Sequence, residues 1–538
     1  MKSKIDFHEK LNIIVEKFKI MCYNTFCNKI LKYIFESEKR CFASMKKLGF
    51  DNDKYIALQS EKILERINSF GGKLYLEFGG KLFDDHHAAR VLPGFMPDSK
   101  LRMLEKLKDR AEIVLVISAG DIEKNKQRGD LGITYDLEAL RLIDAFRSIG
   151  LYVGSVVITQ FEAQPAAEAF RQKLESLGIH VYKHYTIPNY PSDIPFIVSE
   201  DGLGKNEYIE TTRELVVITA PGPGSGKMAT CLSQLYHEQK RGVRAGYAKF
   251  ETFPIWSIPL SHPVNMAYEA ATADLNDVNM IDPYHLEAYG KSAVNYNRDI
   301  EIFPVLNAMF EKIYGTSPYK SPTDMGVNMA GFCITDDEVC RKASCDEVVR
   351  RYFAAKCAVR QGHSNGDDVY KIEILMSKLG ITPDSRVPVS YARNKAEETG
   401  EPAMALELAD GRVVTGKTTD LLCAGSALLL NALKLLAGIP EETLLIPPEI
   451  ITPIHHLKVS HMGHKNPRMH TDELLIALSI CGNTDENAAL AIEQLDNLRG
   501  AEAHSTVLLA RVDENVFKKL GINLTCDPVY QRNNLYHR

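Results

Sequence analysis

Short apolar runs alternate with segments of helical periodicity through the first half of the chain, and this alternation restricts the fold more than any other feature. Between the runs, apolar residues recur every three or four positions, as at Leu137, Leu140 and Ile143. Continuous apolar strands are typical of a sheet that is covered on both faces. We therefore predict an α/β protein with a doubly wound, mainly parallel sheet. The predicted strands are 73–78, 113–117, 156–159, 181–182, 196–198, 215–219 and 245–248.

The stretch 215–230 predicts a strand, a glycine-rich loop and the start of a helix. The first N–H groups of a helix have no partner inside it, and glycines let the backbone approach an anion closely. A phosphate group is therefore the natural ligand. A solvated turn rich in Gly and Pro is the alternative. The residues predicted to bind the phosphate groups of a cofactor are Gly222, Gly224, Ser225, Gly226, Lys227 and Thr230.

The match of this loop to the Walker pattern is incomplete. Pro221 stands where the first glycine belongs, and Met228 stands where the magnesium-binding Ser or Thr belongs. Asp274 and Asp277 are three residues apart, on one face if the segment is helical, and we expect them to bind Mg²⁺ in its place. Two exposed surface aspartates are the alternative. The predicted cofactor is thus ATP or GTP with Mg²⁺.

Polar residues follow several of the predicted strands. Ligands of parallel sheets lie beyond the carboxyl ends of the strands, so these tails are candidate site residues. Asp121 and Lys124 follow the second strand as candidate catalytic residues, and Arg128 and Lys205 are candidates for binding substrate. Lys249 and Glu251 end a further run. Each tail taken alone is also compatible with a solvated loop.

The last third of the chain begins again with short strands, at 405–408 and 412–414, joined by an Asp-Gly turn as in a hairpin. A Gly-Lys-Thr sequence follows, but it lacks the upstream glycines of a phosphate loop, so a simple turn is the alternative there. We keep Lys417, and Ser426 at the start of the next helix, as candidates for binding an anionic substrate.

Five of the 16 histidines gather between His455 and His470. His461 and His464 have a spacing that suits zinc, but no cysteine lies close by in sequence and no H-E-x-x-H occurs, so we expect neither a structural zinc nor a zincin-type protease. Histidines mixed with Lys465 and Arg468 ahead of a helix suit an anion equally well. His461 and His464 are therefore candidate catalytic residues. Lys465, Arg468 and His470 are candidates for binding the substrate. The alternative is that these histidines lie on the surface or pack within the fold.

Composition excludes several classes of function. The 538 residues carry a formal charge of −6, which argues against a nucleic-acid partner. No apolar run is long enough to span a bilayer, so no membrane partner is expected. The 11 cysteines show no C-x-x-C spacing, which is typical of reduced thiols in a cytoplasm. The expected partner is a small phosphorylated or acidic molecule, and self-association into a homo-oligomer stays open.

Residues 1–44 differ from the rest, with nine Lys and Arg against five Asp and Glu and three of the 11 cysteines. A membrane-surface helix and an ordinary packing helix are two interpretations. We favour a third, in which they are an extension of the reading frame and the functional chain begins at Met45. The predicted organisation is then a Rossmann or P-loop-like α/β domain (45–325), a helical subdomain (326–395) and a smaller α/β domain (396–538).

From about Met45 to its C-terminus, the chain resembles a family of bacterial cytoplasmic proteins that is known only as a domain, or protein, of unknown function. The stretches that carry the resemblance are 76–95, 220–227, 280–290 and 320–328. The resemblance implies a multidomain α/β protein with a helical subdomain. It implies no reaction and no catalytic residues.

Three functions are therefore kept. The first is an ATP- or GTP-dependent phosphotransferase or ligase-like enzyme that uses the loop around Lys227. The second is a hydrolase or isomerase acting on a phosphorylated or acidic metabolite at the histidine cluster. The third is a non-catalytic sensor of a nucleotide or metabolite.

Overall fold

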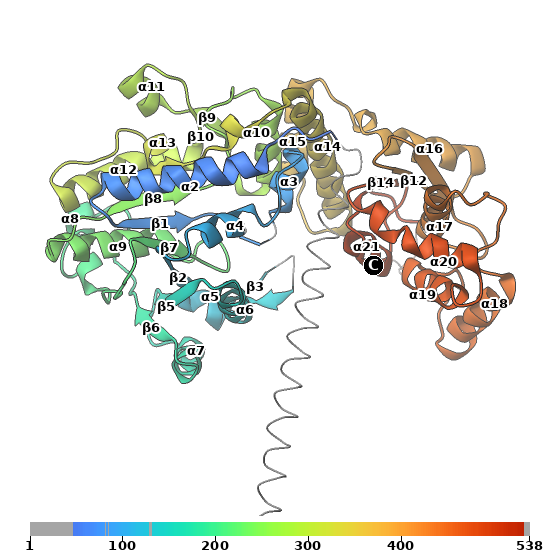
Figure 1. The fold of residues 1–538 in the computed structure, drawn as a ribbon, viewed down its shortest axis with the longest axis horizontal. Helices are drawn as coiled ribbons and strands as arrows, with labels where there is room; N and C mark the ends of the chain where they lie inside the picture. Colours follow the sequence, from blue (N-terminus) through green and yellow to red (C-terminus); the bar gives the residue numbers. More distant parts are fainter. Residues whose placement is uncertain (1–46, 81, 84, 129–131, 532–538) are drawn as a thin grey trace, which may run out of the picture. The chain divides into compact units, whose positions relative to one another are not determined.

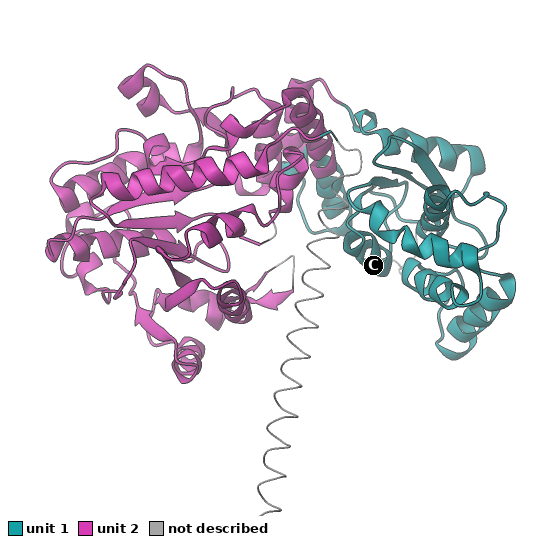
Figure 2. Ribbon diagram, in the orientation of Figure 1, with its two compact units in different colours: residues 1–47, 352–369, 382–538 teal, residues 48–351, 370–381 magenta. Residues whose placement is uncertain are grey.

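The computed structural model describes residues 47–80, 82–83, 85–128 and 132–531. These form two compact units (Figure 2). The N-terminal unit consists of Leu48–Arg351 and Tyr370–Ile381, and the described residues of Tyr352–Val369 and Thr382–Arg538 belong to the C-terminal unit. The chain passes between the units within α14 (Asp337–Gln361), within the first turn of α15 (Asp367–Leu379) and again after α15, at Ile381. The prediction for residues 1–44 lies outside the described residues, and the predicted domain boundaries stay a prediction.

A seven-stranded sheet, parallel at every pairing, forms the centre of the N-terminal unit (Figure 1). Its order is β11-β8-β1-β7-β2-β5-β6. The predicted α/β fold with a doubly wound, mainly parallel sheet is confirmed. The strands are β1 (Leu74–Phe78), β2 (Ala111–Ser118), β5 (Tyr152–Thr159), β6 (His180–Lys183), β7 (Leu215–Thr219), β8 (Gly246–Phe250) and β11 (Gly326–Val327).

One predicted strand, 196–198, is wrong. The segment forms the short helix α8 (Ile194–Ile197). The Asp193 side chain accepts a hydrogen bond from the Phe196 amide, and Pro195 occupies the first turn. An aspartate cap and a proline in the first turn both favour a helix start over a strand.

The sheet is buried on both faces. Val216 and Ile218 pack against Leu232 of α9 (Lys227–Lys240) and Phe303 of α12 (Asn297–Tyr314) on one face. Val217, which points to the opposite face, is equally buried. The other α-helices among the described residues before 336 are α2 (Asn52–Ser69), α3 (His86–Val91), α4 (Ser99–Lys106), α5 (Ala119–Glu123), α6 (Tyr135–Ser148), α7 (Pro165–Ser176), α10 (Pro263–Ala271), α11 (Pro283–Tyr289) and α13 (Pro322–Met325).

The direction of the connections reverses at β1 and β7, which are neighbours in the sheet. The strand that follows β1 is β2, on the far side of β7, whereas the strand that follows β7 is β8, on the far side of β1. Because such crossovers are right-handed, the segments leaving β1 and β7 depart to opposite faces. A crevice at the carboxyl ends of these strands is where ligands of open α/β sheets bind.

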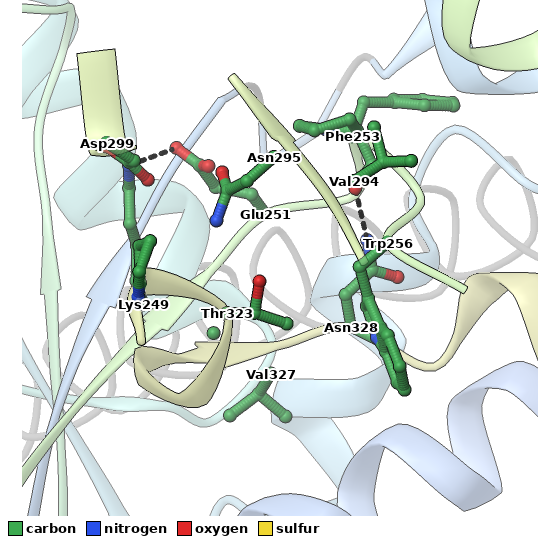
Figure 3. Close-up of a pocket in the computed structure, with 13 residues that line it drawn as sticks. Lys249, Glu251, Phe253, Trp256, Val294, Asn295, Asp299, Thr323, Val327 and Asn328 are labelled. Carbon is green, nitrogen blue, oxygen red and sulfur yellow. Dashed lines mark hydrogen bonds and ion pairs between the residues drawn. The ribbon is translucent and has the colours of Figure 1, made fainter. Parts of the chain in front are cut away.

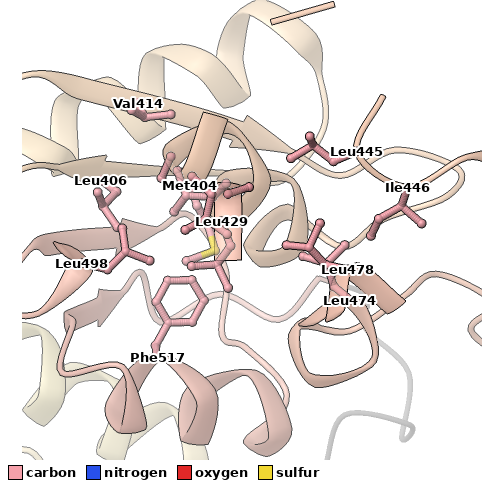
Figure 4. Close-up of a cluster of buried hydrophobic side chains, with 14 of the residues drawn as sticks. Met404, Leu406, Val414, Leu429, Leu445, Ile446, Leu474, Leu478, Leu498 and Phe517 are labelled. Carbon is pink, nitrogen blue, oxygen red and sulfur yellow. The ribbon is translucent and has the colours of Figure 1, made fainter. Parts of the chain in front are cut away.

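The C-terminal unit contains a four-stranded sheet in the order β13-β12-β14-β15. The predicted hairpin is present as the antiparallel pair β12 (Ala403–Glu407) and β13 (Val413–Lys417), and β14 (Glu502–Ser505) pairs with β15 (Asn523–Cys526) in parallel. Leu429, Leu478 and Phe517 belong to its apolar core (Figure 4). Its remaining helices are α16 (Val387–Thr399), α17 (Ala424–Ala437), α18 (Pro448–His456), α19 (Thr471–Cys481), α20 (Glu486–Glu493) and α21 (Arg511–Lys519).

Among the described residues, none of the helices combines the length and the apolar character that a bilayer crossing requires.

Candidate functional site

The loop between β7 and α9 has a backbone that only glycine adopts readily. Gly224 and Gly226 have φ angles of 74° and 88°, in the left-handed region. Gly222 is needed for another reason, since a Cβ atom there would lie 2.3 Å from the hydroxyl oxygen of Tyr135. Three glycines of the predicted cofactor site are therefore required by the shape of the loop itself.

Six consecutive amides, from Gly224 to Ala229, donate no hydrogen bond to any described residue. The last three begin α9, whose N-cap Gly226 has no side chain with which to cap them. The Lys227 side chain is half-buried, and its ammonium group forms no hydrogen bond or ion pair with any described residue. Unpaired amides at the positive end of a helix beside a free ammonium group form a cradle suited to an anion.

The hydroxyl groups of this segment are turned inward. The Ser225 hydroxyl donates to the Gly222 carbonyl at 2.6 Å, and the Thr230 hydroxyl donates to the Gly226 carbonyl at 3.0 Å. Thr159, at the end of β5, donates to the Ser225 carbonyl at 2.6 Å and so fixes the loop. Ser225 can therefore offer an anion its amide, and the position of Thr230 is explained by the helix start.

A pocket of about 40 Å³ that opens to solvent lies beyond the carboxyl end of β8 (Figure 3). β8 and β11 supply its floor, and the junction of β10 (Val294–Tyr296) with α12 supplies one wall. β10 itself pairs with β9 (Asn279–Ile281) in a short hairpin. The lining residues are Lys249, Glu251, Phe253, Pro254, Trp256, Val294, Asn295, Asp299, Pro322, Thr323, Gly326, Val327 and Asn328.

One lysine joins two carboxylates at the polar end of the pocket. The Lys249 ammonium donates to both oxygens of Asp299, at 2.8 and 2.7 Å, and lies 3.2 Å from Glu251. Burial opposes its charge, but the two carboxylates outweigh burial and raise the pKa of Lys249. Burial raises the pKa of Glu251, and the nearby Asp299 carboxylate adds to the shift. The Tyr296 hydroxyl donates to Glu251 at 2.6 Å.

The loop and the pocket belong to the same edge of the sheet. Only β1 separates β7 from β8, so their carboxyl ends are about 10 Å apart. Glu77, in β1, accepts a hydrogen bond from Tyr247 of β8 at 2.7 Å. An anion held by the loop therefore lies within the length of a small molecule from the pocket.

Other residues predicted at the sheet edge do not join the loop or the pocket. Asp121 pairs with Lys126 at 3.2 Å, Lys124 is exposed, and Arg128 is held by the buried carboxylate of Glu138. Lys205 is exposed and lies over the ring of Tyr185. Its neighbour Leu203 accepts a hydrogen bond from Ser233, in the second turn of α9 and so away from the helix start.

The structure places Asp274 and Asp277 in different surroundings, and the magnesium site that their spacing predicts stays a prediction. Asp277 is buried and binds Arg298, with its oxygens 2.6 and 2.7 Å from the guanidinium. Asp274 is exposed, in a 3₁₀ turn (Ala273–Leu275). The Arg298 guanidinium neutralises much of the charge of Asp277, which weakens this carboxylate as a ligand for a cation. Within the described ranges, no three His, Cys, Asp or Glu side chains gather in the manner of metal ligands.

The candidates of the histidine cluster lie in the C-terminal unit and have separate surroundings. His461, His464, Lys465 and Lys417 are exposed. The Arg468 guanidinium donates to the Thr419 carbonyl at 2.6 Å, and the buried Ser426 hydroxyl donates to the Met469 carbonyl at 2.9 Å. These contacts brace the chain between β13 and α19, and no shared anion site is formed by these side chains among the described residues.

His470 is the member of this cluster with a strong interaction. Its Nδ1 atom lies 2.8 Å from Asp513 and 3.9 Å from the Cys423 sulfur. These hydrogen bonds, with Asp513 first, raise the pKa of His470 to about 10. The imidazole is therefore charged at neutral pH, which suits an ion pair within the unit.

Sequence reasoning missed three polar residues of the pocket. Lys249 and Glu251 were identifiable as the tail of a strand, but Asn295, Asp299 and Thr323 come from a stretch without clear periodicity. In the sequence, only the polar residues Asn295 and Asp299 around Tyr296, at the start of a helical pattern, pointed to a site there. The pairing of β11 with β8 brings Thr323 to the pocket, and the ion pair with Lys249 holds Asp299 there.

Comparison with known proteins identifies the family. The profile described as "Domain of unknown function DUF1846, N-terminal" matches residues 48–380, and its C-terminal counterpart matches residues 384–536. Proteins named UPF0371 from Streptococcus thermophilus and Streptococcus sanguinis are each 59% identical over 494 residues, which is 92% of this chain and 100% of theirs. A UPF0371 protein from Streptococcus pyogenes is 58% identical over the same length. The chain therefore belongs to the DUF1846 family, bacterial members of which carry the name UPF0371 and whose function is unknown.

Proposed function

We propose that the chain binds the phosphate groups of ATP or GTP at the loop between β7 and α9 and acts as a phosphotransferase or ligase-like enzyme. The observation that carries this proposal is the run of six amides from Gly224 to Ala229, together with Lys227, none of which has a partner among the described residues. Fixed amides and a lysine are the groups that phosphate oxygens require.

The position of the loop supports the proposal. It follows β7, at the point where the connections of the sheet reverse, and the pocket lies at the end of β8, a strand two strand spacings (about 10 Å) from β7. Phosphoryl transfer depends mostly on positioning and charge neutralisation. A phosphate-binding loop next to a pocket for the acceptor molecule could provide both.

We propose that Mg²⁺ accompanies the nucleotide, but we no longer propose that Asp274 and Asp277 bind it. Because Asp277 is bound to Arg298 and the hydroxyls of Ser225 and Thr230 face inward, we assign no side chain of the chain to Mg²⁺. The metal would then be held by the phosphate oxygens and water. The hydrolase alternative receives no comparable support, because His461 and His464 are exposed and not brought together with a buried acid or base.

Calorimetric titration of the full chain with ATP and GTP, with and without Mg²⁺, tests this function. Lys227→Ala should abolish the binding that wild type shows, while Lys205→Ala, at an exposed lysine away from the start of α9, should keep it. Ligand at about one hundred times Kd should also add roughly 2.7 kcal/mol of stability to wild type alone. Equal binding by wild type and Lys227→Ala would refute the site, and binding without turnover would favour a sensor over an enzyme.

A further inference from the structure

Among the described side chains that line the pocket beyond β8, Asn295 has a hydrogen-bond donor without a partner. The Asn295 side-chain oxygen accepts from the Tyr296 amide at 2.9 Å, which fixes the orientation of the carboxamide. Its nitrogen has no acceptor among the described residues and points into the pocket (Figure 3). A ligand atom opposite this nitrogen must therefore accept a hydrogen bond.

The facing side of the pocket presents an acceptor. The Thr323 hydroxyl donates its proton to Asp282 at 2.6 Å, and Asp282 is fully buried as the N-cap of α11. The oxygen of Thr323 keeps its lone pairs and points toward Asn295 (Figure 3). A ligand atom at this point must therefore donate a hydrogen bond.

The charges of the pocket exclude an anion. Asp299 and Glu251 face it with a single ammonium, Lys249, already bound between them. A phosphate or carboxylate ligand would meet two carboxylates, and among the described side chains of the lining only Asn295 offers it an unpartnered donor. A cation is also disfavoured, because the Lys249 ammonium already occupies the position between Asp299 and Glu251.

The remaining lining is apolar. Val294 and Val327 contribute aliphatic surface, and Trp256 is held in place by its indole N–H, which donates to the Asn328 carbonyl at 2.8 Å. Asn328 is itself fixed, since its amide donates to the carbonyls of Thr252 and Pro254. A fixed aromatic ring with aliphatic neighbours suits the C–H surface of a small ring or chain.

We propose that this pocket binds a small uncharged ligand with adjacent hydroxyl groups, a sugar or polyol, whose hydroxyls bridge Asn295, Thr323 and Glu251. A single hydroxyl group can satisfy both sides of the pocket, because it accepts a hydrogen bond from Asn295 and donates one to Thr323 or Glu251. The assignment of this ligand as the acceptor of a phosphoryl group rests on the proposed function, whereas its binding does not.

Saturation-transfer NMR on the full chain, with a panel of glucose, galactose, mannose, ribose, myo-inositol and sorbitol, tests the pocket. We expect at least one of these compounds to bind. Glu251→Gln and Thr323→Val should each weaken that binding about tenfold or more, as expected for the loss of one good hydrogen bond to a ligand. Glu175→Gln, on the exposed face of α7, is the matched control and should bind as wild type does.

The outcomes separate this inference from the proposed function. Lys227→Ala should lose nucleotide binding and keep sugar binding. If the chain binds no nucleotide but binds a sugar, and Glu251→Gln weakens that binding, the pocket assignment is supported and the proposed phosphotransferase function is refuted. The pocket assignment is overturned if no panel member binds, if glucose 6-phosphate binds more tightly than glucose, or if both pocket variants bind as wild type does.

Discussion

Gly79, directly after β1, lies against Glu251, directly after β8. A Cβ atom on Gly79 would come within 2.9 Å of the Glu251 Cγ atom, and the Gly79 amide donates to the Phe250 carbonyl at 2.9 Å. Glu251 therefore reaches the pocket over the end of a neighbouring strand that has no side chain at this point.

Gly79→Ala should displace Glu251 and destabilise the N-terminal unit by about 1–3 kcal/mol, the usual cost of overpacking. It should also weaken the sugar binding proposed above. Thermal unfolding and saturation-transfer NMR measure the two effects. Gly120→Ala is the control, because the nearest atom to its added Cβ is 3.6 Å away and its φ is not positive. Similar stabilities for the two variants would contradict the close packing of Gly79.

Lys249→Met should destabilise the N-terminal unit by about 3–5 kcal/mol at neutral pH, because it leaves Glu251 and Asp299 buried without their cation. The loss should shrink as the pH falls, since Glu251 has a raised pKa and takes up a proton first. Urea unfolding at pH 5 and pH 7.5 measures this. Adding Asp299→Asn to Lys249→Met should recover part of the stability, and a double variant weaker than the single one would speak against charge as the cause.

His470 should make the stability of the C-terminal unit dependent on pH. Its pKa is raised from 6.5 to about 10 in the folded chain, mainly by Asp513. The stabilisation, on the order of 3 kcal/mol, is therefore complete below pH 6.5 and is lost as the pH rises through about 10. His470→Gln should flatten this dependence. Pulse-labelling hydrogen exchange of residues 471–481 after incubation in urea at pH 6, 8 and 10 reports it, and parallel curves for wild type and variant would exclude the ion pair.

Arg386 should be the most sensitive arginine of the C-terminal unit. It is almost fully buried, pairs with Glu502 at 2.8 Å and donates to the carbonyls of Ala503 and Asn523. Arg386→Ala should cost about 3–5 kcal/mol, and Arg386→Lys should recover little of it, because an ammonium cannot match several fixed acceptors at once. Urea unfolding checks both variants. Arg412→Lys, at an exposed ion pair with Asp410, should stay within about 0.5 kcal/mol of wild type.

The sequence predicted the fold correctly where a short stretch of residues determines its own secondary structure. The run 215–219 and the glycines after it predicted a strand, a loop and a helix, and each is present. The segment 196–198 misled because its apolar run is short, and Asp193 and Pro195 settle its conformation. Spacing also predicted that Asp274 and Asp277 act together, but their partners are set by tertiary structure, and Arg298 is 21 residues from Asp277. Asn295 and Thr323 could not be assigned to one site, since no local pattern records which distant strands pair.

β11, a strand of only two residues, sets the order in which the two sites can form during synthesis. The parts of the chain that shape the phosphate loop, including Tyr135, Thr159 and the helix α9, end at Lys240. The pocket has no floor until Gly326 and Val327 pair with Lys249 and Phe250, some 75 residues after β8. In a chain that grows from its N-terminus, the cradle for an anion can therefore be complete while the neighbouring pocket is still an open strand edge. That exposed edge of β8 is the surface that a nascent chain of this family has to shield until residue 328 has been added.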